Sequence, residues 1–188
     1  MLEVESRQGD ELRIQHHWRD EVLVDPFEIS AGVVIPVGAY AFRDFNLELE
    51  TADQRKVWGR FSYGTGPFYD GDRVQTGYSV SWRPSGRLLT SIGYEANDVR
   101  LPQGDFVTRL VQYRTEVVFS ARLSWVTLIQ YDNISEIVGI NSRVHWIPEA
   151  GREAFLVLNH NVQDLDGDNR FNSISADVAV KFNYTFRF

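Results

Sequence analysis

Residues 174–188 read Ile-Ser-Ala-Asp-Val-Ala-Val-Lys-Phe-Asn-Tyr-Thr-Phe-Arg-Phe, with an apolar residue at every even-numbered position. Polar or charged residues fill the odd-numbered positions, with Ala179 as the one exception. Successive side chains of a β-strand point to opposite faces of its sheet. Alternation of this kind therefore predicts a long strand with one apolar and one polar face.

The same period of two recurs through the rest of the chain. It predicts ten strands, at residues 11–24, 39–51, 54–64, 72–83, 86–97, 105–119, 121–132, 137–147, 152–163 and 173–188. The face of the strand at 152–163 is ambiguous, because Phe155 and Val157 compete with Leu156 and Leu158. Strands of soluble domains usually hold about 5–6 residues, whereas a tilted strand needs about 9–11 to cross the apolar layer of a bilayer.

We therefore predict an all-β fold: an antiparallel up-and-down transmembrane β-barrel of about ten long strands over residues 1–188, or part of a larger barrel. Short turns are expected at 51–54, 83–86, 120 and 148–151, and longer loops at 25–38, 64–71, 98–104, 133–136 and 164–172. Short turns at one end and long loops at the other are typical of outer-membrane barrels. The rival fold is a soluble lipocalin-like carrier barrel, which turns its apolar face inward around a ligand.

Composition narrows the classes of function. The net charge of −7 argues against nucleic acid as a partner, and the absence of cysteine excludes a disulfide framework and a thiolate metal site. A mean hydropathy of −0.29, with no apolar run of about 20 residues, excludes a transmembrane helix. A strand that is apolar on one face only still gives a polar average.

The polar face of the predicted barrel would line its lumen. The candidate lumen-lining residues are Arg73, Arg114, Glu116, Arg122, Arg143, His145, Asp177 and Lys181. Two interpretations stay open: a lumen closed by cross-strand ion pairs, or a polar path for solutes.

Aromatic residues gather near the ends of the predicted strands. Those expected at the periplasmic interface are Trp82, Trp146, Tyr184 and Phe186, and those expected at the outer interface are Trp18, Tyr63, Tyr94, Phe106 and Tyr131. Two such girdles anchor a barrel in the headgroup layers, although aromatic residues also favour strands in general.

Two features of the sequence resemble known outer-membrane proteins. The terminal alternation ending in Tyr184, Phe186 and Phe188 resembles the signal that the barrel-assembly machinery reads. Three further stretches resemble the C-terminal barrel of large, uncharacterised bacterial outer-membrane proteins whose full-length members carry a carbohydrate-binding family-nine-like domain. They are Asp-Pro-Phe-Glu-Ile through Ile-Pro-Val-Gly-Ala-Tyr (25–40), Phe-Tyr-Asp-Gly-Asp (68–72), and Asn-Ser-Arg-Val-His-Trp-Ile-Pro through Leu-Val-Leu-Asn-His (141–160).

The resemblance implies a location in the bacterial outer membrane, with the lipid bilayer and the barrel-assembly machinery as partners and sugars or small solutes as candidate ligands. The expected function is a porin-like channel or the membrane anchor of a carbohydrate-related surface protein; a purely structural closed barrel is the alternative. The family's export signal and sugar-binding domain are missing, and residues 3–7 before Gly9-Asp10 read as the tail of an earlier strand. We therefore expect the chain to be the C-terminal part of a longer protein.

No motif supports an enzyme. The chain has no G-x-S-x-G, H-E-x-x-H or glycine-rich phosphate loop, and we expect no catalytic residue, cofactor or metal. The acidic stretch 164–169 is a weak match to a calcium loop, better explained as a solvated turn. Phe68–Asp72 is more simply a tight turn than a platform for a sugar. His16 and His17 are adjacent on a strand, so they point to opposite faces.

The segment Asp25–Gly38 is too apolar for a free external loop, with six large apolar residues. The members are Phe27, Ile29, Val33, Val34, Ile35 and Val37. We expect it to pack on its own barrel as a plug or lid; the alternative is that it covers a partner.

Overall fold

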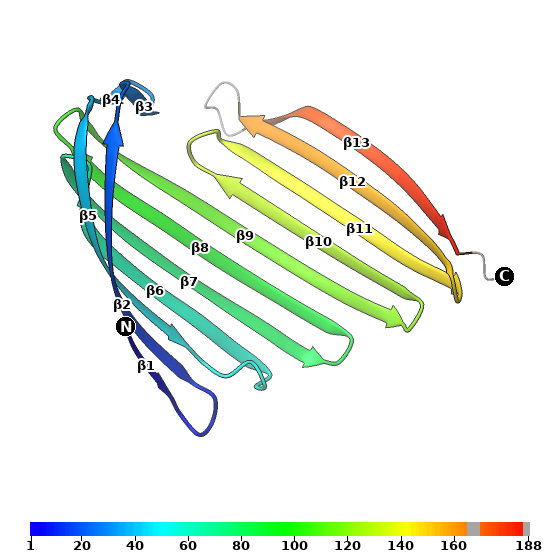
Figure 1. Cartoon of the computed structure of the whole chain (residues 1–188). Helices are drawn as coiled ribbons and strands as arrows, with labels where there is room; N and C mark the ends of the chain where they lie inside the picture. The colour runs from blue at the N-terminus through cyan, green and yellow to red at the C-terminus, as the bar shows by residue number, and fades with distance from the viewer. Residues whose placement is uncertain (165–169, 186–188) are drawn as a thin grey trace. The chain divides into compact units, whose positions relative to one another are not determined.

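The computed structural model describes residues 1–164 and 170–185, and these residues form antiparallel β-strands with no helix (Figure 1). The strands are β1 (Leu2–Glu5), β2 (Glu11–Leu23), β3 (Phe27–Ser30), β4 (Val33–Ile35), β5 (Gly38–Glu50), β6 (Val57–Phe68), β7 (Gly71–Ser85), β8 (Leu88–Leu101), β9 (Gly104–Ser120), β10 (Leu123–Asp132), β11 (Ile137–Glu149), β12 (Arg152–Asp164) and β13 (Phe171–Tyr184). Within the part of the chain that is described, no helix is long and apolar enough to span a membrane.

The main sheet has the strand order β1-β2-β5-β6-β7-β8-β9-β10-β11-β12-β13, and β3 and β4 pair separately. Each strand of the main sheet lies beside its neighbour in sequence once the β3–β4 hairpin is set aside, which is the expected up-and-down order. No closed barrel is detected in the described residues.

All ten predicted strands are present, with ends displaced by a few residues. The expectation that residues 3–7 end a strand before a turn is confirmed, because β1 pairs with β2 from Leu2↔Ile14 to Glu5↔Glu11. Two short strands, β3 and β4, lie inside the segment that we expected to be a loop.

The expected long loops at 64–71 and 98–104 are wrong. β6 continues to Phe68 and β8 to Leu101, so each connection is a two-residue turn. The glycines of β6 suggested a loop because glycine is a poor strand former. They lie instead where neighbours approach closely: a Cβ at Gly66 would lie 2.7 Å from the Arg43 carbonyl oxygen.

Residues 1–79 and 94–109 form one compact unit, here unit 1, and residues 80–93 and 110–188 form the other, unit 2. In unit 1 the hairpin β3–β4 covers part of the sheet. Ile35 is fully buried and Val33 nearly so, against Val99 and Leu101 of β8. The partly buried residues packed around them are Leu23, Ile29, Tyr40, Phe68, Tyr69 and Phe106.

The hairpin packs on the polar face of the sheet. In β2 and β5, register places Leu23 and Tyr40 on the same face as Arg13 and Glu48. The expectation that segment 25–38 packs on its own sheet is therefore correct. Phe106, expected in an aromatic girdle, contacts this core instead.

In unit 2 the register resolves the ambiguous strand. Leu156 and Leu158 of β12 lie opposite Val144 and Ser142 of β11, and opposite Val180 and Val178 of β13. Cross-strand partners share a face. Leu156 and Leu158 thus belong to the apolar face, and Phe155 and Val157 to the polar one.

Candidate functional site

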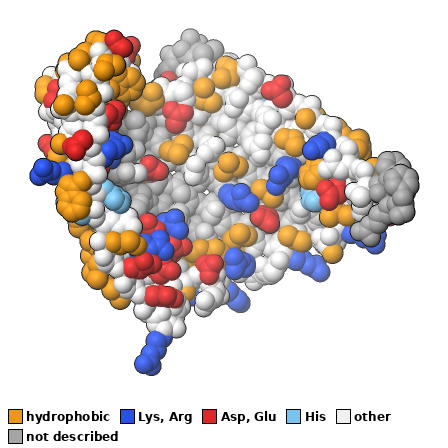
Figure 2. Space-filling model, viewed as in Figure 1, with side chains coloured by type: hydrophobic (Ala, Val, Ile, Leu, Met, Phe, Trp, Pro, Cys, Tyr) orange, Lys and Arg blue, Asp and Glu red, His pale blue; other side chains and the backbone are white. Residues whose placement is uncertain are grey.

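A ladder of ion pairs lies on the polar face of unit 1. Two guanidinium groups contact four carboxylates within it; the members are Glu3, Glu11, Arg13, Glu48, Glu50 and Arg60. Arg13 lies 3.3 Å from Glu3 and 3.5 Å from Glu48, because the three residues are in register across β1, β2 and β5. Figure 2 shows acidic and basic side chains side by side in this region. The ladder keeps an excess of negative charge.

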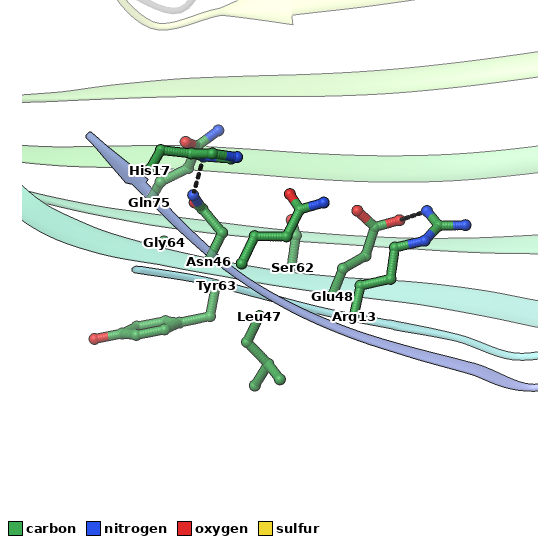
Figure 3. Close-up of a pocket in the computed structure, with 10 residues that line it drawn as sticks. Arg13, His17, Asn46, Leu47, Glu48, Ser62, Tyr63, Gly64 and Gln75 are labelled. Atoms are coloured by element: carbon green, nitrogen blue, oxygen red, sulfur yellow. Dashed lines mark hydrogen bonds and ion pairs between the residues drawn. The ribbon is translucent and has the colours of Figure 1, made fainter. Parts of the chain in front are cut away.

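A hollow of about 300 Å³ adjoins the ladder on the same face (Figure 3). Beyond Arg13 and Glu48, its polar lining consists of Gln15, His17, Asn46, Ser62 and Gln75. Figure 3 shows the side chains of Leu47 and Tyr63 pointing away from this polar group, as alternation along β5 and β6 requires. The hollow is thus lined mainly by amide, hydroxyl and imidazole groups.

Gly64 makes room for the amides of this hollow. A Cβ at Gly64 would lie 2.7 Å from Asn46 Oδ1 and 3.7 Å from Gln75 Oε1. Asn46 Nδ2 lies 3.2 Å from His17 Nδ1, and Gln75 Nε2 donates a hydrogen bond of 3.0 Å to Glu95. These contacts orient both amides and leave Gln75 Oε1 directed toward Gly64.

Of the candidate lumen-lining residues, Arg73 lies in unit 1. Its guanidinium group is 3.6 Å from Asp44 and stacks over the ring of Phe68 at 4.8 Å. Arg73 therefore connects the polar face to the core beneath the hairpin.

The other candidates lie in unit 2. Six of them occupy strands and share the polar face by register: Arg114, Glu116, Arg143, His145, Asp177 and Lys181. Arg114 lies 3.3 Å from Glu116. The seventh, Arg122, lies in the β9–β10 turn, where it donates a hydrogen bond of 3.3 Å to the Pro148 carbonyl.

His145 has a specific environment on this face. Its ring stacks on Phe155 at 4.3 Å with an angle of 7°, and its Nε2 lies 3.8 Å from Glu153. His16 and His17 lie on opposite faces as predicted, since His16 contacts the Trp18 ring at 4.5 Å and His17 contacts Asn46.

Several predicted features lie at turns or outside the described residues. Residues 165–169 of the acidic loop, and Phe186 and Phe188 of the assembly signal, are not described. Tyr184 is exposed, with the Arg152 guanidinium 5.0 Å from its ring. The stretch 68–72 forms a tight turn in which the Tyr69 ring packs 5.3 Å from that of Phe42.

One carboxylate outside the strands is strongly stabilised. Asp10, in the β1–β2 turn, accepts hydrogen bonds from Arg55 at 2.5 and 2.8 Å and from the Ala52 amide at 3.0 Å. The hydrogen bonds from Arg55, followed by that from Ala52, lower the pKa of Asp10 to about 2. This contact joins the β1–β2 turn to the β5–β6 connection.

Neither a scan of protein-family models nor a search of curated proteins returns a match to this chain. The features that bear on function are the two faces of the sheet: one carries exposed apolar side chains, and the other is polar and holds the hollow.

Proposed function

We propose that this chain forms the wall of a bacterial outer-membrane β-barrel, as a porin-like channel or as the membrane anchor of a carbohydrate-related surface protein. The observation that carries the proposal is the contrast between the two faces. One presents large exposed apolar side chains, and the other carries ion pairs and the packed hairpin.

The apolar face of unit 2 supports a lipid environment. Its exposed members include Trp82, Tyr113, Phe119, Trp146, Leu156, Leu158, Val178, Val180, Phe182 and Tyr184. Trp146 of β11 is 50% exposed and Leu156 of β12 is 46% exposed, although each of these strands is paired on both sides. Monomeric soluble proteins rarely expose contiguous apolar surfaces of this kind, whereas acyl chains would cover them favourably.

Strand length supports the same proposal. The strands β5 to β13 hold between 10 and 17 residues, enough to cross an apolar layer that needs about 9–11. Soluble strands are usually about half as long.

The alternative is a soluble lipocalin-like carrier, in which the apolar face surrounds a ligand. The hairpin argues against it, because Val33 and Ile35 bury themselves on the polar face and leave the apolar face uncovered in unit 1. A plug that folds inward from the wall fits a barrel whose polar face is the lumen.

Reconstitution into lipid tests the proposal and distinguishes a channel from a membrane anchor. The refolded chain is added to planar lipid bilayers and to vesicles, and insertion is followed by heat-modifiable migration and flotation. Stepwise conductance supports the channel, and insertion without conductance supports the anchor or a purely structural closed barrel. A chain that stays in buffer, folded and monomeric without detergent, contradicts all three and favours the carrier.

A further inference from the structure

We propose that the hollow beside Gly64 is a binding site for a neutral, hydroxyl-rich solute of monosaccharide size. The inference concerns unit 1 alone, and it stands whether or not the barrel conducts. It rests on the lining chemistry, the local charge and the volume of the hollow.

The lining combines donors and acceptors within a small space. Asn46, Gln75 and Gln15 each carry an amide that both donates and accepts, and the Ser62 hydroxyl does the same. A polyol presents hydroxyls that also donate and accept, so it can pair with each of these groups. A cation would bind only the acceptor oxygens, and an anion would bind only the donor groups.

The charges beside the hollow disfavour an anion. Arg13 is already engaged by Glu3, Glu11 and Glu48, and four carboxylates share two guanidinium groups in the ladder. Glu95 adds a further carboxylate behind Gln75. Because the excess of carboxylates would also attract a cation, the probes below differ in charge and share one carbon skeleton.

Two glycines fix the positions of polar side chains that line the hollow. Gly64 lacks the Cβ that would collide with Asn46 Oδ1, and a Cβ at Gly77 would lie 2.5 Å from Ser62 Oγ. The missing side chains let Asn46 and Ser62, which line the hollow, lie close to the backbone of β6 and β7. The hollow's volume of about 300 Å³ is at the small end of ligand pockets, which suits a single ring.

The test is a saturation-transfer NMR titration of the full chain, folded in detergent micelles, with D-glucose, D-glucosamine and D-gluconate as probes. Two variants address the site: Gly64→Ala inserts a methyl group, and Gln75→Ala removes an acceptor without adding atoms. Gly139→Ala is the matched control, since its Cβ would lie 3.1 Å from Asn161 Oδ1 on the polar face of unit 2. Far-UV circular dichroism checks that each variant folds. If Gly64→Ala does not fold, the test relies on Gln75→Ala alone.

We expect glucose to bind the native chain, gluconate to bind more weakly, and Gln75→Ala and Gly64→Ala each to weaken glucose binding by about tenfold. Gly139→Ala should bind glucose like the native chain. The proposal is overturned if glucose does not bind, or if both site variants bind it unchanged. It is also overturned if glucosamine binds about tenfold tighter than glucose, which would indicate a cation site.

Discussion

Trp125 donates an indole hydrogen bond of 2.7 Å to Ser142 Oγ across the β10–β11 ladder, on the mainly apolar face of the sheet. Thr127, which is buried, lies 2.9 Å from the same Ser142 oxygen. The three polar groups satisfy one another. Such pairing would be required on the lipid-facing surface that we propose, because the hydrocarbon layer offers no water as a partner.

Replacing Ser142 by alanine tests how much these hydrogen bonds contribute to stability. Ser142→Ala removes the shared partner of Trp125 and Thr127, and we expect the free energy of unfolding to fall by about 1–3 kcal/mol. Urea unfolding in detergent or lipid, followed by tryptophan fluorescence, measures the change. Ser124→Ala, on the polar face of β10, is the control and should change stability by no more than about 0.5 kcal/mol. Equal effects of the two substitutions would count against a special environment at Ser142.

The Asp10–Arg55 contact predicts a pH dependence. The pKa of Asp10 is lowered from 3.8 to about 2 in the folded chain, so its contribution to stability is present above pH 4. That contribution is lost as the pH falls from about 4 towards 2 and the carboxylate takes up a proton. Hydrogen exchange of the Ala52 amide, which donates to Asp10, should accelerate in this window relative to its intrinsic rate. In Asp10→Asn the acceleration should disappear, and its persistence there would assign the effect to another group.

The hairpin predicts a contrast between neighbouring residues. Ile35 is fully buried and Val34 is exposed, although both belong to β4. Ile35→Ala should lower the free energy of unfolding of unit 1 by about 2–5 kcal/mol and should increase proteolysis in segment 25–38. Val34→Ala should leave stability within about 0.5 kcal/mol. Similar protease sensitivity in the two variants would contradict the packing described for β4.

A charge placed on either face of β13 should have unequal costs. Val178→Arg puts a cation on the proposed lipid face and should cost about 2–4 kcal/mol of folding free energy near the middle of the bilayer. Ala179→Arg puts the same cation on the polar face, near Asp177 and Lys181, and should cost much less. Reversible refolding into vesicles across a urea series gives both values. Equal costs would contradict the proposal that one face of β13 contacts lipid and the other contacts water.

Much of this fold could be predicted from alternation alone, because the period of two is strong wherever one face of a strand is apolar. Alternation does not assign the faces of the strand at 152–163, since both of its faces carry large apolar residues. Only the register with β11 and β13 assigned Leu156 to the apolar face and Phe155 to the polar one, where Phe155 stacks on His145.

The wrong loop prediction at 64–71 concerns residues whose role is set by neighbours distant in sequence. Gly64 and Gly66 looked like loop residues, but they lie where Asn46 and Arg43 approach the strand. The hairpin β3–β4 was missed because its strands hold only three or four residues. The sequence signal for its turn is Gly32, because glycine readily adopts a positive φ. In the structure the φ of Gly32 is 76°, and its amide donates a hydrogen bond to Glu28.

The hollow was not predicted either. Its members come from β2, β5, β6 and β7, and no local motif connects them. The available signal was weaker: Gln15, Asn46 and Gln75 occupy polar-face positions where alternation permits any polar residue. The missing Cβ of Gly64, which lets Asn46 lie close to β6, becomes meaningful only once the strands are paired.

A spin-label scan of β12 tests the central claim, that the apolar face of the sheet contacts lipid, most directly. The chain contains no cysteine, so single cysteines at Leu156, Val157, Leu158 and Asn159 each give a unique label. In lipid vesicles we predict that labels at 156 and 158 collide preferentially with dissolved oxygen, and labels at 157 and 159 with a water-soluble nickel chelate. The opposite alternation, or equal access of the nickel chelate to all four positions, would contradict the account.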